Sequence, residues 1–406
     1  MTATQPATGG ARDTAFEREA RIHLQVYARQ PLVLVSGEGS WVLDEHGNRY
    51  LDFVAGIAVA VLGHAHPAVA DAIAAQARRL LQVSNLYYTL PQLELAELLL
   101  DRSPFDRAFF VNSGTEANEA AIKLARRRGR ERGATEIVAL EGSFHGRTLG
   151  SLAATGQPKY REPFAPLPGG FVHVAPNDIE ALTAAVTERT CAVLVEPIQG
   201  EGGIHPLSDE FLAAARSACD RADALLVFDE VQTGMGRTGT FFAFEQTAVV
   251  PDAVTLAKGL GGGVPIGAVL VSEGAAAFHT GDHGTTLGGN PLACAAAIAT
   301  LRVLDEDLLD RVRERGRRLA SGLQGLIGDG LLTEVRGRGL MLGLETAGPW
   351  ARQVVDHARD VERLLVNATG DSTLRLVPPL TVSEDEVDEA LGRLRRSLVA
   401  VAEAAR

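Results

Sequence analysis

Short apolar runs recur between about residues 107 and 272, and each is followed by a glycine-containing or polar turn and, in most cases, a helical stretch. The runs are rich in Val, Leu, Ile, Phe or Ala and show no polar alternation, which is typical of strands buried on both faces. They cover residues 108–111, 137–140, 191–195, 224–228, 254–257 and 266–271. The pattern predicts an α/β fold in which helices cover a mainly parallel sheet.

Other patterns flank this region. Residues 32–35 and 41–43 alternate around a glycine turn, as in a hairpin, and residues 91–100 carry leucines at helical spacing. After Pro291, a helix of small residues over about 292–305 precedes an α+β pattern: apolar stretches at 331–335, 339–344 and 374–376, then a final helix from about Ser383. The sequence therefore predicts a second, smaller α+β domain.

This pattern suggests three parts. Residues 1–62 form an N-terminal segment, with a small, polar tail to about residue 13 that we expect to be disordered and a remainder that packs with the small domain. Residues 63–291 form the large domain, and residues 292–406 the small C-terminal domain.

Composition narrows the function. The formal net charge of −12 argues against a nucleic-acid partner, and the arginine run 126–130 is interpreted as a solvated helix face. No apolar stretch reaches the ~20 residues that span a bilayer, and residues 1–10 lack the organisation of a secretion signal. Cys191, Cys219 and Cys294 lie far apart, as buried reduced thiols do. We expect a cytoplasmic protein with no membrane contact and no metal site.

Only three of the 39 basic residues are lysines. Lys258 follows the run 254–257 and enters residues 259–263, four of which are glycines that let the backbone approach a ligand closely. A lysine there is a candidate Schiff-base nucleophile, because partial desolvation and nearby positive charge activate its amine. Lys123 in a helix and Lys159 in a proline-rich stretch are predicted to be solvated.

Polar residues follow other runs. Ser113-Gly114-Thr115, between a strand and a helix, forms either an anion site or an ordinary N-cap turn. Asp229 could keep a pyridine nitrogen protonated near a cofactor; capping a helix or binding a metal are the alternatives, and no His/Cys cluster supports a metal. Thr285 and Thr286 offer hydroxyls for a second hold on a phosphate, or only a glycine-rich turn.

Two isolated arginines could bind carboxylates bidentately. Arg147 lies at a predicted strand end, and Arg375 alternates with leucines in an apolar stretch. An unpaired buried charge is costly, so Arg375 should be paired or functional. Glu201, in a glycine-rich stretch, is a plausible partner for it.

Together, residues 112–120, 144–148, 228–237 and 257–263 resemble the class III (ornithine/GABA-type) pyridoxal-phosphate (PLP) aminotransferases. The resemblance runs from about residue 27 to 380 and is closest to the acetylornithine aminotransferases. It implies the PLP-dependent transferase fold of the aspartate aminotransferase type (fold type I).

The resemblance also implies a PLP site. Phe144 would stack on the cofactor ring, Gln232 would lie near the ring hydroxyl, and Lys258 would form the Schiff base. Thr286 would reach the phosphate in the neighbouring subunit, which implies a homodimer with shared active sites. The implied cofactor residues are Ser113, Gly114, Thr115, Phe144, Asp229, Gln232, Lys258 and Thr286, with Lys258 and Asp229 catalytic.

The implied reaction transfers the terminal amine of N2-acetyl-L-ornithine to 2-oxoglutarate in two half-reactions, as in arginine biosynthesis. Arg147 would take the α-carboxylate of acetylornithine, with Thr285 close to the substrate. Arg375 would take the α-carboxylate of glutamate or 2-oxoglutarate. Glu201 would neutralise Arg375 while the amine substrate is bound and swing aside for the dicarboxylate.

Two positions depart from the family pattern: Ala60 replaces an asparagine, and Leu287 stands where an aromatic residue is usual. They leave open a sibling enzyme acting on succinylornithine, ornithine or 4-aminobutyrate. A PLP racemase and a non-catalytic PLP-binding regulator are further alternatives. Arg147, Arg375 and Glu201 together favour transamination with a dicarboxylate.

Overall fold

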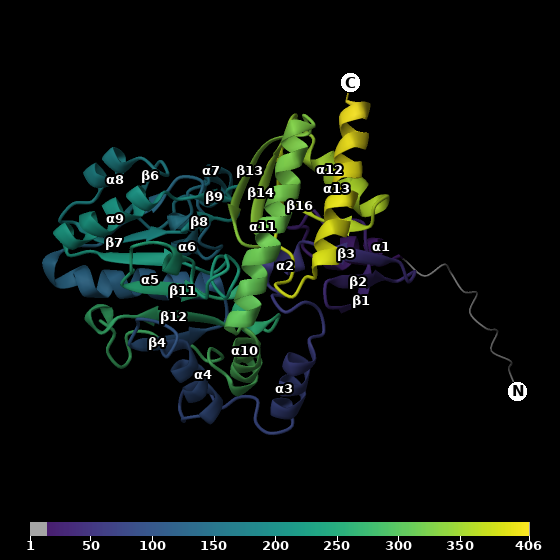
Figure 1. Ribbon diagram of the computed structural model, residues 1–406. Helices are drawn as coiled ribbons and strands as arrows, with labels where there is room; N and C mark the ends of the chain where they lie inside the picture. Colours follow the sequence, from purple (N-terminus) through teal and green to yellow (C-terminus); the bar gives the residue numbers. More distant parts are fainter. Residues whose placement is uncertain (1–13, 406) are drawn as a thin grey trace, which may run out of the picture.

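The computed structural model describes residues 14–405, and the predicted disorder of the first 13 residues lies outside them. A seven-stranded sheet in the order β4-β12-β11-β10-β7-β5-β6 forms the centre of the larger part (Figure 1). Its strands are β4 (Arg107–Val111), β5 (Glu136–Leu140), β6 (Phe171–Val174), β7 (Thr190–Val195), β10 (Leu225–Asp229), β11 (Ala253–Leu256) and β12 (Gly267–Val271). The pairs from β11 to β6 are parallel, and β12 is antiparallel to both β11 and β4. The predicted mainly parallel sheet is confirmed.

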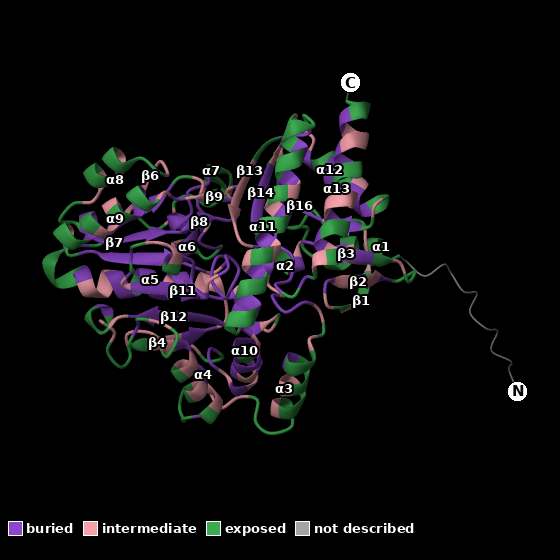
Figure 2. Ribbon diagram, in the orientation of Figure 1, coloured by how far each residue is buried: buried purple, intermediate pink, exposed green. Residues whose placement is uncertain are grey.

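Helices cover both faces of this sheet. In β7, Val193 and Val195 belong to the same buried cluster as Phe211 of α9, whereas Ala192 and Leu194 belong to a second cluster with α5. Both faces of β7 are therefore buried, which explains its unbroken apolar sequence. Figure 2 shows the buried layer running through the sheet. The helices of this part are α5 (Gly114–Gly129), α6 (Leu149–Ala154), α7 (Pro158–Arg161), α8 (Ile179–Ala185) and α9 (Asp209–Ala222).

Three further helices gather beyond β4. They are α3 (Pro67–Ala77), α4 (Leu90–Leu100) and α10 (Pro291–Val303), and α10 packs against both others. The predicted helix after Pro291 is thus present, with Asn290 as its cap: the side chain accepts a hydrogen bond from the Ala293 N–H.

The smaller part contains two four-stranded sheets. One has the order β13-β14-β17-β16, and α11 packs on β13. The other has the order β1-β2-β3-β15, so a strand from the C-terminal third pairs with β3 of the N-terminal segment. The elements are α1 (Ala15–Ile22), β1 (Leu34–Glu38), β2 (Trp41–Asp44), β3 (Arg49–Asp52), α2 (Ala55–Ala58), α11 (Glu306–Gly328), β13 (Leu332–Arg338), β14 (Met341–Thr346), α12 (Ala351–Asp360), β15 (Leu364–Leu365), β16 (Asn367–Ala368), β17 (Thr373–Leu376) and α13 (Glu384–Ala404). The three-part division at residues 62 and 291 stays a prediction.

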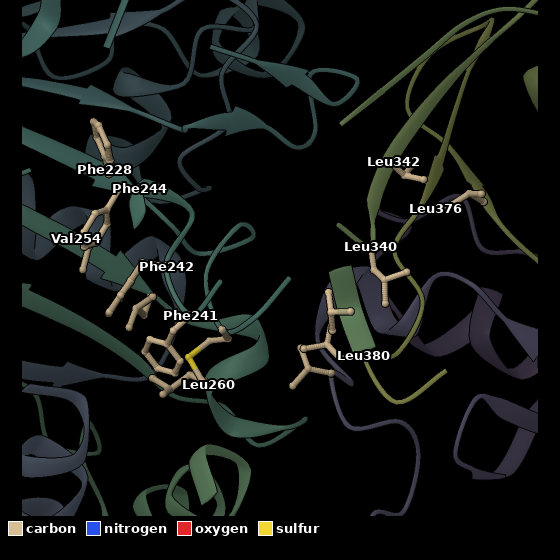
Figure 3. Close-up of a cluster of buried hydrophobic side chains, with 14 of the residues drawn as sticks. Phe228, Phe241, Phe242, Phe244, Val254, Leu260, Leu340, Leu342, Leu376 and Leu380 are labelled. Carbon is tan, nitrogen blue, oxygen red and sulfur yellow. The ribbon is translucent and has the colours of Figure 1, made fainter. Parts of the chain in front are cut away.

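One buried cluster joins the two parts. Figure 3 shows Phe228 and Phe242 on the side of the large sheet, facing Leu342 and Leu376 of the small one. Phe242 is fully buried, and its ring stacks on Phe244 with centroids 5.1 Å apart. The remaining short elements are β8 (Ile198–Gln199), β9 (His205–Pro206) and the 3₁₀ turns η1 (Arg130–Arg132), η2 (Glu162–Phe164), η3 (Ala243–Gln246), η4 (Lys258–Gly261) and η5 (Glu273–Ala275). Between residues 14 and 405, no helix has the length and apolar character needed to cross a membrane.

Candidate active site

A cavity of about 420 Å³ opens at the carboxyl ends of the large sheet's strands. The cavity is lined by Asp229, the last residue of β10, and by four residues that follow β4, β5, β7 and β11, namely Ser113, Phe144, Glu196 and Lys258. Ligands of open α/β sheets bind at this edge. The sheet therefore brings together polar residues that lie up to 145 residues apart in the sequence.

Lys258 begins the turn η4 with a left-handed backbone (φ 38°), and its side chain enters the cavity. Within residues 14–405 its amine makes no hydrogen bond or ion pair. Burial lowers the pKa of Lys258 to about 8, although Glu201 nearby acts in the opposite direction. At pH 7 that shift increases the neutral fraction of the amine about 300-fold over an ordinary lysine. Lys258 is therefore an unpaired amine with a larger neutral fraction than an ordinary lysine, as a Schiff-base nucleophile needs.

The N-terminus of α5 forms another wall. Ser113 caps the helix, accepting a hydrogen bond from the Glu116 N–H at 3.3 Å. The N–H groups of Gly114 and Thr115 open the first turn, where the helix provides no acceptor for them. The Thr115 hydroxyl accepts from the backbone N–H groups of Arg147 and Thr148, so it fixes the neighbouring loop. Free N–H groups at a helix N-terminus suit a phosphate.

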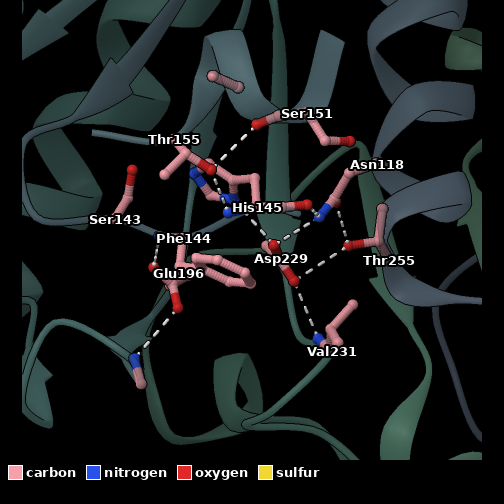
Figure 4. Close-up of polar contacts among 12 residues, drawn as sticks. Asn118, Ser143, Phe144, His145, Ser151, Thr155, Glu196, Asp229, Val231 and Thr255 are labelled. Atoms are coloured by element: carbon pink, nitrogen blue, oxygen red, sulfur yellow. Dashed lines mark hydrogen bonds and ion pairs between the residues drawn. The ribbon is translucent and has the colours of Figure 1, made fainter. Parts of the chain in front are cut away.

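Asp229 receives hydrogen bonds from four groups (Figure 4). Oδ2 accepts from the Asn118 amide at 2.7 Å and lies 2.8 Å from His145 Nδ1. Oδ1 accepts from the Val231 N–H at 3.0 Å and from the Thr255 hydroxyl at 3.4 Å. These four contacts fix the orientation of the Asp229 carboxyl at the wall of the cavity.

His145 and Glu196 are further buried groups beside Asp229, and sequence reasoning gave neither a role. Burial would lower the pKa of His145, but the hydrogen bond and charge of Asp229 outweigh it and raise the pKa. His145 Nε2 is buried with no hydrogen-bond partner among the described residues. Burial raises the pKa of Glu196 to about 7, and its carboxyl accepts from the N–H groups of Phe144 and Gly200. The sequence offers one signal for a role of His145: it directly follows Phe144, in the loop after β5.

The ion pair expected between Arg375 and Glu201 is present. Arg375 is fully buried, and its Nη1 lies 2.5 Å from Glu201 Oε1. The same nitrogen donates to Gln232 Oε1 at 3.2 Å, and Gln232 Nε2 donates to Glu201 at 3.4 Å. Burial would raise the pKa of Glu201, but the positive charge of Arg375 outweighs it and lowers the pKa. Gln232 thus contacts this ion pair, besides lining the cavity.

Arg147 lines the same cavity in a different way. It is exposed, and within residues 14–405 its guanidinium makes no hydrogen bond or ion pair. Aromatic rings hold it instead, with Cζ 5.3 Å from the centroid of Phe144 and 4.1 Å from that of Tyr160. Its N–H donors are therefore free for a carboxylate.

Thr285 and Thr286 do not line the cavity. Asn112 donates to the Thr285 hydroxyl at 3.3 Å, whereas Thr286 is exposed and its carbonyl accepts from Gln82. The predicted contact of Thr286 with the cofactor phosphate of a neighbouring subunit stays a prediction. Among residues 14–405, no group of three or more His, Cys, Asp or Glu side chains could hold a metal ion.

The cavity thus combines a lysine amine with a lowered pKa, the N-terminus of a helix, a hydrogen-bonded carboxyl and Arg147, and the Arg375–Glu201 ion pair borders it. Comparisons with known proteins agree with this chemistry. A family model described as aminotransferase class-III matches residues 25–398. The acetylornithine aminotransferase of Gloeobacter violaceus is 54% identical over 386 residues, which cover 94% of this chain and 96% of that protein.

Two solved structures are also similar. The N-acetylornithine aminotransferase from Stenotrophomonas maltophilia K279a is 42% identical with a TM-score of 0.81, covering 94% of this chain and 98% of that one. The ornithine aminotransferase from Toxoplasma gondii, with partial occupancy of PLP at its active site, is 33% identical with a TM-score of 0.91, covering 96% and 94%. These matches confirm the predicted fold type. The chain belongs to the class-III aminotransferases.

Proposed function

We propose that this protein transfers the δ-amino group of N2-acetyl-L-ornithine to 2-oxoglutarate, giving N-acetyl-L-glutamate 5-semialdehyde and L-glutamate, with PLP as cofactor. One observation carries the proposal. Lys258, whose amine makes no hydrogen bond within residues 14–405 and has a pKa lowered to about 8, lines one cavity with Asp229 and Arg147, and the Arg375–Glu201 ion pair borders it. The relatives named above as acetylornithine aminotransferases support the choice of amine donor.

The residues present fit PLP. Lys258 has a free amine for the cofactor aldehyde, and the N–H groups of Gly114 and Thr115 with Ser113 fit its phosphate. Asp229, oriented by four hydrogen-bonded contacts, would pair with the pyridine nitrogen. Phe144 would stack on the ring. Bound PLP supplies an electron sink for the charge that is left when a proton leaves the substrate carbon next to nitrogen.

Lys258 acts twice in the proposed reaction. Its neutral amine would hold the cofactor through the cofactor's aldehyde, until the substrate's terminal amine takes its place. Once free, the amine of Lys258 would take the proton from the substrate carbon and later give a proton back; in the protein without cofactor, burial lowers its pKa to about 8. A group with a pKa near the working pH serves both as base and as acid.

The two arginines bind different carboxylates in the proposed reaction. Arg147, free of any carboxylate, binds the α-carboxylate of acetylornithine, with Thr285 at the edge of the substrate site. Arg375 binds the α-carboxylate of 2-oxoglutarate or glutamate after Glu201 has moved aside. While the amine donor is bound, the Glu201 carboxylate at 2.5 Å neutralises Arg375. This arrangement favours transamination over racemisation, which needs no second, gated carboxylate site.

We further propose a homodimer in the cytoplasm with shared active sites, in which Thr286 reaches the phosphate of the neighbouring subunit. Asn85 donates to the carbonyls of Thr285 and Gly288, so the segments around residues 85 and 286 lie side by side. They expose apolar side chains, among them Tyr88 at 95% and Leu287 at 55%. An exposed apolar patch next to Thr286, whose proposed ligand lies in the neighbouring subunit, supports self-association. All three cysteines are free and buried, in keeping with a reducing compartment.

The test is a single-turnover spectrum without any keto acid, with N-acetylornithine, succinylornithine, ornithine and 4-aminobutyrate added in separate experiments. We expect the absorption band of the lysine-bound cofactor to convert to that of the amino form fastest with N-acetylornithine. Faster conversion with another amine would keep the chemistry and overturn the donor. Absence of the lysine-bound band after PLP is added would overturn the whole proposal.

A further inference from the structure

Tyr160 contacts both walls of the predicted substrate site, although neither its sequence context nor the cavity lining assigns it a role. Its ring centroid lies 4.1 Å from Arg147 Cζ. Its ring also meets that of Phe144 edge to face, with centroids 5.9 Å apart and an interplanar angle of 81°. One half-buried ring therefore joins the residue proposed to stack on the cofactor to the residue proposed to bind the substrate carboxylate.

The ring is fixed in place from its own side. Tyr160 lies in the short helix α7, and the Tyr160 N–H donates to the carbonyl of Gln157 at 3.1 Å. The Gln157 amide in turn donates to the carbonyl of Gly142 at 3.1 Å. Gly142 belongs to the loop after β5 that carries both Phe144 and Arg147. Helix α7 is thus anchored to the same loop whose arginine it contacts.

The cation–π contact between Arg147 and Tyr160 leaves the guanidinium able to bind a carboxylate. A cation on an aromatic face is attracted to the ring without using any of its N–H donors. A carboxylate partner would occupy those donors, as Glu201 does at Arg375. Arg147 is exposed and makes no hydrogen bond or ion pair with residues 14–405, so without the rings it would be free to rotate. Lys159 Nζ lies 4.8 Å from the same ring and adds positive potential nearby.

We propose that Tyr160 is a positioning residue for the carboxylate of the amine donor: its ring holds the Arg147 guanidinium over the cavity mouth with every N–H donor available. The inference rests on the proposed function and deepens it, because it names the residue that orients Arg147. The phenol oxygen has no hydrogen-bond partner in the described chain, so the ring face, and not the hydroxyl, carries the effect.

The experiment compares Tyr160→Leu with Tyr160→Phe in the PLP-loaded protein. The probe is N2-acetyl-L-norvaline, which has the carboxylate and acetamide of the donor but no δ-amine and therefore cannot react. Its Kd is measured by calorimetry. We expect Tyr160→Leu to raise Kd about two- to fivefold, the size of an exposed cation–π contact, and to raise the KM for N-acetylornithine by the same factor with little change in kcat. Tyr160→Phe should restore both values, because it keeps the ring.

A double-mutant cycle separates positioning from a general structural effect. In an Arg147→Gln background, Tyr160→Leu should leave the Kd of N-acetylnorvaline unchanged, because the group it positions is gone. Phe164→Leu, an aromatic-to-leucine change at an exposed site in the following turn, is the matched control. An equal loss in the Arg147→Gln background, or wild-type binding by Tyr160→Leu, would overturn the inference.

Failure of this inference is distinguishable from failure of the proposed function. If wild-type protein neither captures PLP nor accepts the amino group of N-acetylornithine, the proposed function fails. If it does both while Tyr160→Leu binds N-acetylnorvaline as tightly as the wild type, only the role of Tyr160 fails.

Discussion

Replacing Glu201 by glutamine removes the charge that the fully buried Arg375 faces at 2.5 Å while keeping the shape of the side chain. Breaking a buried ion pair costs about 3–5 kcal/mol. Glu201 is a quarter exposed, and glutamine can still accept a hydrogen bond from Arg375, so the free energy of unfolding should fall by a smaller amount, about 1–3 kcal/mol. Urea denaturation of the wild type and of Glu201→Gln measures this difference.

The pH dependence of this difference has a definite sign. The pKa of Glu201 is lowered in the folded protein, so its contribution is fully present above the unfolded value of about 4.5. That contribution is lost as the pH falls through the lower pKa of the folded state. The stability gap between the wild type and Glu201→Gln should therefore be constant near neutral pH and close in acid.

The two half-reactions should respond in opposite directions. Without Glu201, the incoming 2-oxoglutarate no longer competes for Arg375, so its KM should fall by up to about tenfold, or 1.4 kcal/mol. In the donor half-reaction the uncompensated charge of Arg375 repels the substrate ammonium, and kcat/KM for N-acetylornithine should fall. Stopped-flow absorbance measures each half-reaction separately in Glu201→Gln, with Glu210→Gln on the exposed face of α9 as the control. An equal loss of kcat/KM in both half-reactions would refute the proposal that Glu201 blocks Arg375 until the dicarboxylate binds. Glu201 would then have a structural role only.

Three other changes test the site and the core. Lys258→Ala should abolish covalent capture of PLP, seen as no cofactor retained after borohydride reduction, while phosphate contacts still bind PLP weakly and reversibly. In the wild type, the rate of PLP capture by cofactor-free protein should rise about tenfold per pH unit below 8 and level off above it, because burial lowers the pKa of Lys258 to about 8 and only the neutral amine reacts; a plateau beyond pH 10 would contradict this environment. Phe242→Ala should lower the free energy of unfolding by about 3–5 kcal/mol in urea titrations, since the ring is fully buried between the two parts; a loss below 1 kcal/mol would show that the junction tolerates the cavity.

The sequence predicted most of the large sheet because its strands are buried on both faces and therefore uniformly apolar. For the same reason it could not predict the direction of β12, which is antiparallel to its neighbours but equally apolar. Strand β6 was missed, since its four residues include His173 and only one residue is buried. The turn α2 was also missed: Ile57 has φ 66°, a conformation that a β-branched residue strongly disfavours. Asp52 holds it by accepting from the N–H groups of Val54 and Ala55.

The site was predictable where a polar residue directly follows a strand, as Asp229 and Lys258 do. The groups that surround Asp229 were not, because Asn118 lies inside a helix and Thr255 inside a strand, and only the tertiary packing turns them toward the carboxylate. The roles assigned to the site residues stay predictions until substrate and cofactor binding are measured. The role of Thr286 stays a prediction as well, because its proposed ligand would lie in another copy of the chain.

The two arginines also explain how one cavity could serve two different substrates. Arg375 is buried and needs a counter-charge at all times, so the protein supplies Glu201, which must move before a carboxylate can bind. Arg147 is exposed, so it tolerates the absence of a counter-charge and needs only to be oriented, which is the role proposed for the rings of Phe144 and Tyr160. A carboxylate common to every donor thus meets an arginine that is always available. The second carboxylate, present only in the keto acid and in glutamate, meets one that is available only after exchange. On these proposed roles, the burial of one guanidinium and the exposure of the other would decide when each carboxylate can bind.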